Sequence, residues 1–217
     1  MKALHPISAV LVASLLLVAA CSRPAPEITA AGSVPTGNQE EATGSVPVAD
    51  QAEASVSDKP WYTDRLEKLG FYVFPAPEPI PPFTVRTLKG AAANLASVAG
   101  NVVLLNFWAT WCPPCRTEMP SIQILNDKLK GSAFAVFAIS VAEKPATVTE
   151  FLKSNPYSFP MYLDESGAAS APFAGQGIPT TFILDKQGRA IAGMVGARSY
   201  DGPEVVALFK ELSERLQ

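Results

Sequence analysis

The chain contains little cysteine and almost no histidine. It has 217 residues, with three cysteines, Cys21, Cys112 and Cys115, and one histidine, His5. Three cysteines are too few for the disulfide framework that stabilises many small secreted domains. Because the only imidazole lies close to the N-terminus, the rest of the chain has no histidine to ligate a metal or haem or to act as a general base. Histidine-dependent chemistry is therefore excluded there.

A strong net charge and a long apolar run are also missing. The formal net charge is −3, so no basic surface is predicted and nucleic acid is not an expected partner. The apolar run from Ile7 to Ala20 has 14 residues, whereas a membrane-spanning helix needs about 20. With Lys2 before it, the run has the length and flanking charge of a signal peptide, which we place at residues 1–20.

The residues that end this run point to lipidation. Val18-Ala19-Ala20-Cys21 resembles the lipobox of bacterial lipoproteins, in which the cysteine is lipidated and becomes the first mature residue. Cleavage by an ordinary signal peptidase is the alternative, since Val18 and Ala20 are small. Two acyl chains anchor a protein stably. We therefore expect a protein held by lipid at Cys21 on the periplasmic side of a bacterial envelope, at either the outer or the inner membrane.

The residues after Cys21 lack the composition of a folded domain. Ser22 to Asp58 contain no Phe, Trp or Tyr and carry Arg23 against six acidic residues. Such a segment cannot bury a core. Residues 21–58 are therefore predicted to be the lipidated N-terminus and a disordered tether.

A short structured extension is predicted next. Trp61 to Leu69 can form an amphipathic helix that ends at Gly70, followed by the apolar strand "FYVF". The proline-rich stretch from Pro75 to Pro82 must be extended, and we place the domain boundary there. Residues 59–77 are taken as the extension and residues 78–217 as the main domain.

The main domain has the pattern of an α/β fold. The expected strands are 83–88, 101–109, 134–141, 180–185 and 189–195, and the expected helices begin at 113, at 148 and near 205. The run "NVVLLNFWA" is apolar throughout, as in a strand buried on both faces. With the helix from Pro113 and the strand from Phe134 it forms a right-handed βαβ unit. The order is β-β-α-β-α-β-β-α.

Two cysteines lie where the central strand gives way to a helix. Cys112 is at the expected helix start and Cys115 follows one turn later, so their sulfurs can meet. Pro113 suits a first helical turn, where its missing N–H is not needed. The N–H groups and dipole at a helix start stabilise a thiolate. Cys112 is therefore the expected nucleophile.

Two stretches around these features resemble a known family. "VVLLNFWATWCPPCRTEMP" and "GIPTTFILDKQGRAIAGMVG" are similar to TlpA/ResA-like thiol–disulfide oxidoreductases of the thioredoxin superfamily. Trp111 precedes the cysteine pair, Pro120 follows Cys115 by five residues, and Ile178-Pro179 matches the family's cis-proline segment. The resemblance covers residues 78–217. It implies an α/β, thioredoxin-like fold with a central mixed sheet flanked by helices and an N-terminal β-strand extension.

The resemblance also implies roles for individual residues. Pro179 is expected to be cis and to pack against the dithiol, with the Ile178 backbone beside a substrate chain. Asn106 stands where thioredoxin has a buried aspartate that moves protons. Glu118 matches a glutamate of the ResA-like branch and is the candidate proton relay; an ordinary solvated glutamate is the alternative. The expected substrate-contacting residues are Trp111, Pro113, Pro114, Ile178 and Pro179.

The function implied is thiol–disulfide exchange without a metal or organic cofactor. Cys112 attacks a substrate disulfide and Cys115 resolves the mixed disulfide. The family suggests reduction of exported proteins, in cytochrome c maturation or thiol repair, with electrons from an inner-membrane donor of the DsbD/CcdA kind.

Three other uses of the cysteine pair are open from the sequence. A structural staple would close so short a loop that it adds little stability. Structural zinc needs four ligands, but two thiolates can hold Cu(I), so a metallochaperone is one alternative. A peroxiredoxin-like peroxidase is another, although Ala109 stands where those proteins have threonine.

Overall fold

The computed structural model describes residues 59–216. The predicted signal peptide, the lipidation site Cys21 and the predicted tether lie outside the described residues. The elements in chain order are α1 (Thr63–Lys68), β1 (Tyr72–Pro79), β2 (Val85–Thr87), β3 (Ala92–Ala93), the 3₁₀ helix η1 (Leu95–Val98), β4 (Val102–Trp108), α2 (Pro113–Lys128), β5 (Phe134–Val141), α3 (Pro145–Ser154), β6 (Met161–Asp164), α4 (Ala171–Ala174), β7 (Thr180–Leu184), β8 (Arg189–Val195) and α5 (Pro203–Arg215).

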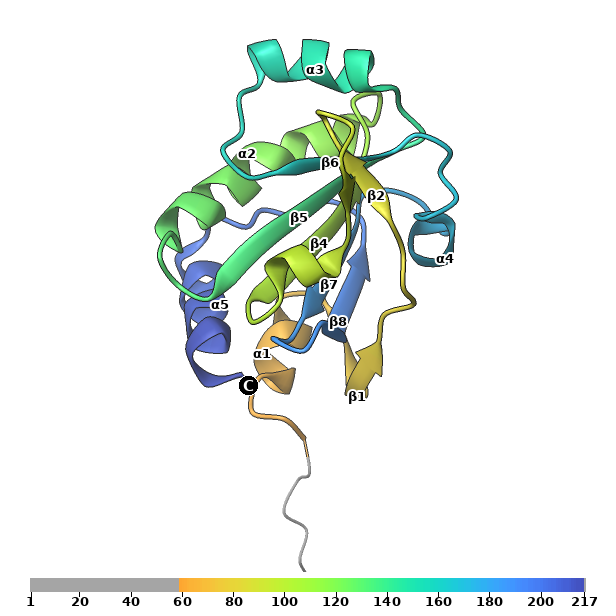
Figure 1. Cartoon of the computed structure of the whole chain (residues 1–217). Coiled ribbons are helices and arrows are strands. Elements are labelled where there is room, and N and C mark those ends of the chain that lie inside the picture. The colour runs from red at the N-terminus through yellow and green to blue at the C-terminus, as the bar shows by residue number, and fades with distance from the viewer. Residues whose placement is uncertain (1–58, 217) are drawn as a thin grey trace, which may run out of the picture. The chain divides into compact units, whose positions relative to one another are not determined.

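The strands form one mixed sheet in the order β1-β8-β7-β4-β5-β6-β2-β3 (Figure 1). β4, β5 and β6 are parallel neighbours, and the remaining pairs are antiparallel. All seven residues of β4 are buried, which accounts for its unbroken apolar sequence, because it has a neighbour on each side and packed layers on both faces. The mixed α/β sheet flanked by helices agrees with the expected fold class.

Helices cover both faces of the sheet. One core joins α1, α2, α3 and α5 to β4, and its fully buried members include Leu66, Trp108, Ile122 and Phe209. The opposite core packs η1 and α4 against the sheet around Phe107. Figure 1 shows α2 and α5 on one side of the sheet and α4 on the other. The first turn of α2 therefore emerges where the central strand β4 ends.

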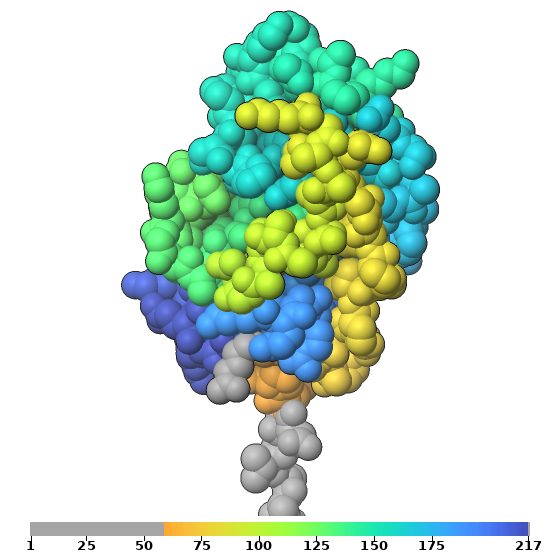
Figure 2. Space-filling view, in the orientation of Figure 1, coloured from red at the N-terminus to blue at the C-terminus, as the bar shows by residue number. Residues whose placement is uncertain are grey.

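The N-terminal extension is part of the same sheet. β1 continues through the expected boundary to Pro79 and pairs antiparallel with β8, with a register shift between Val73 and Glu78. Figure 2 shows β1 and the residues after it, coloured yellow, along the edge of the unit beside the blue β7–β8 hairpin. Prolines are tolerated in β1 because an edge strand has one side without a partner. The proline-rich stretch therefore does not separate the extension from the sheet.

The sequence pattern missed some short elements. β6, with the sequence MYLD, has four buried residues between β5 and β2, too few to show a strand periodicity. α4 and β3 are shorter than the patterns used to predict elements, at four and two residues. α3 begins at Pro145 rather than Val148, since proline is favoured in a first helical turn.

Candidate active site

Cys112 and Cys115 are joined by a disulfide at the start of α2. Cys112 is the N-cap residue, and its Sγ accepts a hydrogen bond from the Cys115 backbone N–H at 3.2 Å. Cys112 is 3% exposed and Cys115 is completely buried, so Cys112 offers the sulfur that another protein can reach. In the reduced protein the same N–H and the helix dipole favour a thiolate at Cys112.

The loop before β7 brings a cis proline to this disulfide. The Ile178–Pro179 peptide bond is cis, as expected, and Gly177 before it has a φ of 135°, which favours glycine. The Ile178 carbonyl oxygen lies 3.7 Å from Cys112 Sγ. Ile178 and Pro179 therefore lie beside the reachable sulfur, which is the arrangement that their proposed contact with a substrate chain requires.

Three other predicted contact residues form the exposed surface around the pair. Trp111 is 64% exposed, and Pro113 and Pro114 are exposed in the first turn of α2. Trp111 follows the end of the buried strand β4, and most of its indole lies in solvent. Trp111 is thus available for contact with another protein.

Glu118 is buried one turn after Cys115. Its side chain accepts hydrogen bonds from Asn106 Nδ2 at 2.8 Å and from the Arg198 backbone N–H at 3.3 Å. Burial raises the pKa of Glu118 to about 7, and the Asn106 hydrogen bond and Arg198 only partly oppose this effect. A carboxyl group that titrates near neutral pH can both take and return a proton. The alternative of a solvated surface glutamate is wrong.

Asn106 supports Glu118 from the neighbouring strand. Its Nδ2 also donates to Thr181 Oγ1 at 3.0 Å, and Asn106 and Thr181 are paired residues of β4 and β7. Both side chains are completely buried. Asn106 is therefore a core amide, and it also holds one oxygen of the Glu118 carboxyl group.

A second buried carboxylate holds the turn that leads into the cysteine pair. Glu143, in the loop after β5, accepts a hydrogen bond from the Thr110 backbone N–H at 2.8 Å and another from the Thr110 hydroxyl group. Ser140 Oγ donates to the same carboxylate at 2.7 Å. No sequence pattern selects Glu143, Arg198 or Thr181, because their roles depend on contacts between distant segments.

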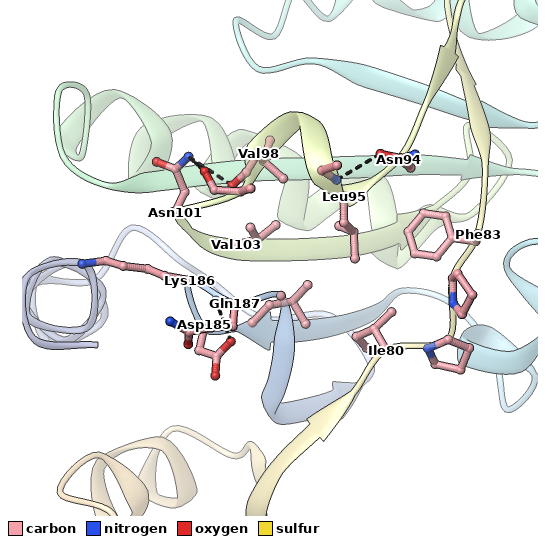
Figure 3. A pocket seen from close by; sticks show the side chains of 16 residues that line it. Ile80, Phe83, Asn94, Leu95, Val98, Asn101, Val103, Asp185, Lys186 and Gln187 are labelled. Atoms are coloured by element: carbon pink, nitrogen blue, oxygen red, sulfur yellow. Dashed lines mark hydrogen bonds between the residues drawn. The ribbon is translucent and has the colours of Figure 1, made fainter. Parts of the chain in front are cut away.

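A cavity of about 550 Å³ lies elsewhere in the fold (Figure 3). Ile80 and Phe83 line it from the segment after β1, Leu95 and Val98 from η1, and Lys186 from the β7–β8 turn. None of the predicted site residues lines this cavity. The chemistry of the cysteine pair therefore belongs to the surface around α2 and the cis proline.

Metal-ligating side chains are not clustered in the described part of the chain. Residues 59–216 contain no group of three or more His, Cys, Asp or Glu side chains that could hold a metal ion. Among the same residues, no helix has the length and apolar character needed to cross a membrane.

Known proteins are similar to this chain in sequence and in fold. The thiol-disulfide oxidoreductase ResA of Bacillus cereus is 32% identical over 119 residues, which are 55% of this chain and 69% of ResA. The thioredoxin-like protein YneN of Bacillus subtilis is 39% identical over 112 residues, or 50% of this chain and 64% of YneN. A solved structure of a secreted thiol-disulfide isomerase from Corynebacterium glutamicum matches with a TM-score of 0.60 and 27% identity, over 67% of this chain and 91% of that one.

A second solved structure gives the same result. A thiol:disulfide interchange protein of the thioredoxin family from Chlorobium tepidum is 29% identical, with a TM-score of 0.53 over 66% of this chain and 98% of its own. The AhpC/TSA family matches residues 77–191, a range that contains both cysteines and the cis proline. The chain belongs to the AhpC/TSA family and is a TlpA/ResA-like thiol–disulfide oxidoreductase of the thioredoxin superfamily.

Proposed function

We propose that this oxidoreductase reduces disulfides of exported proteins while it is held by lipid on the periplasmic side of a bacterial envelope. The observation that carries the proposal is the placement of Cys112, as N-cap of α2 and beside the Ile178 carbonyl oxygen. A substrate disulfide that contacts the exposed Trp111 meets the reachable sulfur of the pair, and the second sulfur is enclosed behind it.

The exchange proceeds in two balanced steps. The Cys112 thiolate attacks one sulfur of the substrate disulfide, the substrate S–S bond breaks, and the departing substrate thiolate takes a proton. The Cys115 thiolate then attacks Cys112 Sγ in the mixed disulfide, the bond to the substrate sulfur breaks, and the second substrate thiolate leaves and takes a proton from water. The substrate gains two electrons, and the enzyme is left with the Cys112–Cys115 disulfide that the structure contains.

Glu118 acts on the second step. Cys115 is completely buried, so its thiol has no direct contact with bulk water to which it could release its proton. The Glu118 carboxylate, one helical turn away and with a pKa of about 7, accepts that proton as Cys115 attacks. The carboxyl group returns it when the pair is reduced again.

Return of the enzyme to the dithiol form requires an electron donor. We propose an inner-membrane protein of the DsbD/CcdA kind, because the exchange needs no metal or organic cofactor and a donor dithiol can attack Cys112 by the same chemistry. A lipid at Cys21, followed by the tether that the composition of residues 22–58 predicts, would let the domain reach both donor and substrates. We propose cytochrome c maturation or repair of oxidised thiols as the process that this reductant serves.

Insulin reduction with single cysteine variants tests these roles. Cys112→Ser is expected to abolish the reduction of insulin, because the attacking sulfur is gone. Cys115→Ser is expected to accumulate mixed disulfides through Cys112, because nothing resolves them. Non-reducing gels and mass spectrometry of the trapped species from the native cell would identify the substrates. A Cys112→Ser protein that reduced insulin at the parental rate would contradict the assignment.

Peroxide and Cu(I) assays separate the other uses of the thiols. Ala109 is completely buried and has no hydroxyl group, so the position three residues before Cys112 cannot hydrogen-bond a peroxide through its side chain. We expect the reduced protein to reduce insulin faster than it consumes hydrogen peroxide. Tight Cu(I) binding by the reduced pair, without insulin reduction, would favour a metallochaperone.

A further inference from the structure

The loop after β8 lies against the buried side of α2. The Arg198 backbone N–H donates to Glu118 Oε2 at 3.3 Å, and the Tyr200 backbone N–H donates to Ser121 Oγ at 3.0 Å. Ser121 Oγ in turn donates to the Glu118 carbonyl oxygen at 2.6 Å. This loop therefore supplies one of the hydrogen bonds that the Glu118 carboxyl group receives.

The Arg198 side chain contacts a different part of the molecule. Its guanidinium group donates to the carbonyl oxygen of Leu69 and lies over the ring of Phe71, with its central carbon 5.0 Å from the ring centroid. The same carbon lies 5.4 Å from the centroid of the Tyr200 ring. Phe71 and Tyr200 are buried. Arg198 thus contacts Glu118 through its main chain and residues 59–71 through its side chain.

Residues 59–71, here called the N-terminal segment, are packed on the domain by several contacts. Leu66 is completely buried, and Arg65 forms an ion pair with Glu211 of α5. The Trp61 ring lies 3.9 Å from the guanidinium carbon of Arg215. This segment is also where the described part of the chain begins.

We propose that Arg198 is a positioning residue that couples the packing of the N-terminal segment to the buried carboxyl group of Glu118. With the segment packed, Leu69 and Phe71 hold the guanidinium group and the 198 N–H remains within reach of Glu118 Oε2. With the segment displaced, the carboxylate loses a donor and a nearby positive charge. Its proton is then held more tightly, and Glu118 accepts the Cys115 proton less readily. This inference rests on the proton-transfer role proposed above for Glu118.

The other groups around Glu118 cannot supply this coupling. Asn106 faces it from β4, with Thr181 of β7 behind Asn106, and Tyr200 faces it from the loop after β8. Burial raises the pKa of Tyr200 well above its usual value, so its hydroxyl group stays neutral. Asn106 and Thr181 do not ionise. Among the described residues that act on Glu118, Arg198 is the one that carries charge at neutral pH.

Carboxyl titration in the oxidised full-length protein tests the coupling. The ¹³C chemical shift of the Glu118 carboxyl carbon would be followed against pH in the parent, Arg198→Met, Arg198→Lys and Phe71→Leu. Arg198→Met keeps the backbone N–H but removes the positive charge and the side-chain hydrogen bond to Leu69, so it should raise the midpoint by about half a pH unit or more. Arg198→Lys retains the charge and one donor and should restore most of the parental midpoint. Arg86→Met, which removes an arginine that also donates to a backbone carbonyl oxygen but lies outside the segment, is the matched control and should leave the midpoint unchanged.

A change at Phe71 tests the same contact from the N-terminal segment. Phe71→Leu keeps the position apolar but removes the ring under the guanidinium group, so it should raise the midpoint in the same direction. If both changes act through one contact, the double variant Arg198→Met/Phe71→Leu should shift no further than Arg198→Met alone. In single-turnover experiments, the pH profile for decay of the mixed disulfide should move with the carboxyl midpoint.

The outcomes separate this coupling from the proposed function. An unchanged midpoint in folded Arg198→Met would overturn the coupling even if the parent reduces insulin, and so would fully additive shifts in the double variant. If Arg198→Met does not fold, an unchanged midpoint in Phe71→Leu has the same consequence. Conversely, a shifted midpoint in a protein that fails to reduce insulin would support the coupling and reject the reductase function.

Discussion

Glu118 illustrates how burial and hydrogen bonding compete at one residue. Its carboxyl group receives two hydrogen bonds and lies near a positive charge, and both effects favour the carboxylate. Glu118 is 2% exposed, and its loss of hydration is the larger effect. Its pKa is therefore raised to about 7, and the carboxyl group keeps its proton up to that pH. The residue that the proposed exchange needs as a proton acceptor is thereby prepared to act at neutral pH.

This raised pKa predicts a pH-dependent loss of stability. Below pH 4.5, the usual value, Glu118 is protonated in both the folded and the unfolded chain. As the pH rises from there to about 7, the unfolded chain releases the proton while the folded protein keeps it, so the free energy of unfolding falls. The loss is complete above that pH and amounts to about 3 kcal/mol.

Glu118→Gln removes this titration and gives the measurement. Denaturant unfolding of the oxidised parent and of the variant at pH 4 and pH 8 would yield four free energies of unfolding. Contributions of other groups cancel in the comparison, so the parent should lose about 3 kcal/mol more than the variant between the two pH values. Equal losses in both proteins would show that Glu118 is not protonated in the folded state near neutral pH.

At the scale of secondary structure, the sequence predicted best where an element is long and its environment uniform. β4 is buried along its whole length and α2 runs for 16 residues from Pro113, and both gave clear patterns. β1 and β6 did not, because β1 contains prolines that only a sheet edge accepts and β6 has four residues. Their assignment depends on β8, β5 and β2, which are distant in sequence.

The helix α1 gives a test at this scale. Leu66 is completely buried, whereas its neighbour Glu67 is exposed. If α1 is a packed part of the domain, Leu66→Ala should reduce the free energy of unfolding by about 2 to 4 kcal/mol through lost burial and a cavity. Glu67→Ala, the matched control, removes only a surface ion pair with Lys59 and should change it by less than about 1 kcal/mol. Equal effects in denaturant unfolding would contradict the packing of α1.

Across the whole molecule, the candidate site combines predictable and unpredictable parts. Cys112, Cys115 and Pro179 were predicted because they lie in local motifs that resemble one family. Arg198 was not, since its contact with Glu118 spans 80 residues of sequence, and a single sequence records no such proximity. The packing of α1, the sheet and the loop after β8 is what brings these groups together behind the disulfide.

The fold makes Cys112 a nucleophile by placing it at the start of α2. The most direct test is the pH dependence of iodoacetamide alkylation of Cys112 in the reduced Cys115→Ala protein, measured folded and again in guanidinium chloride. A thiolate stabilised by the start of α2 predicts a midpoint clearly below about 8.5, the ordinary cysteine value, that returns to about 8.5 on unfolding. Equal midpoints in the folded and unfolded protein would contradict the account.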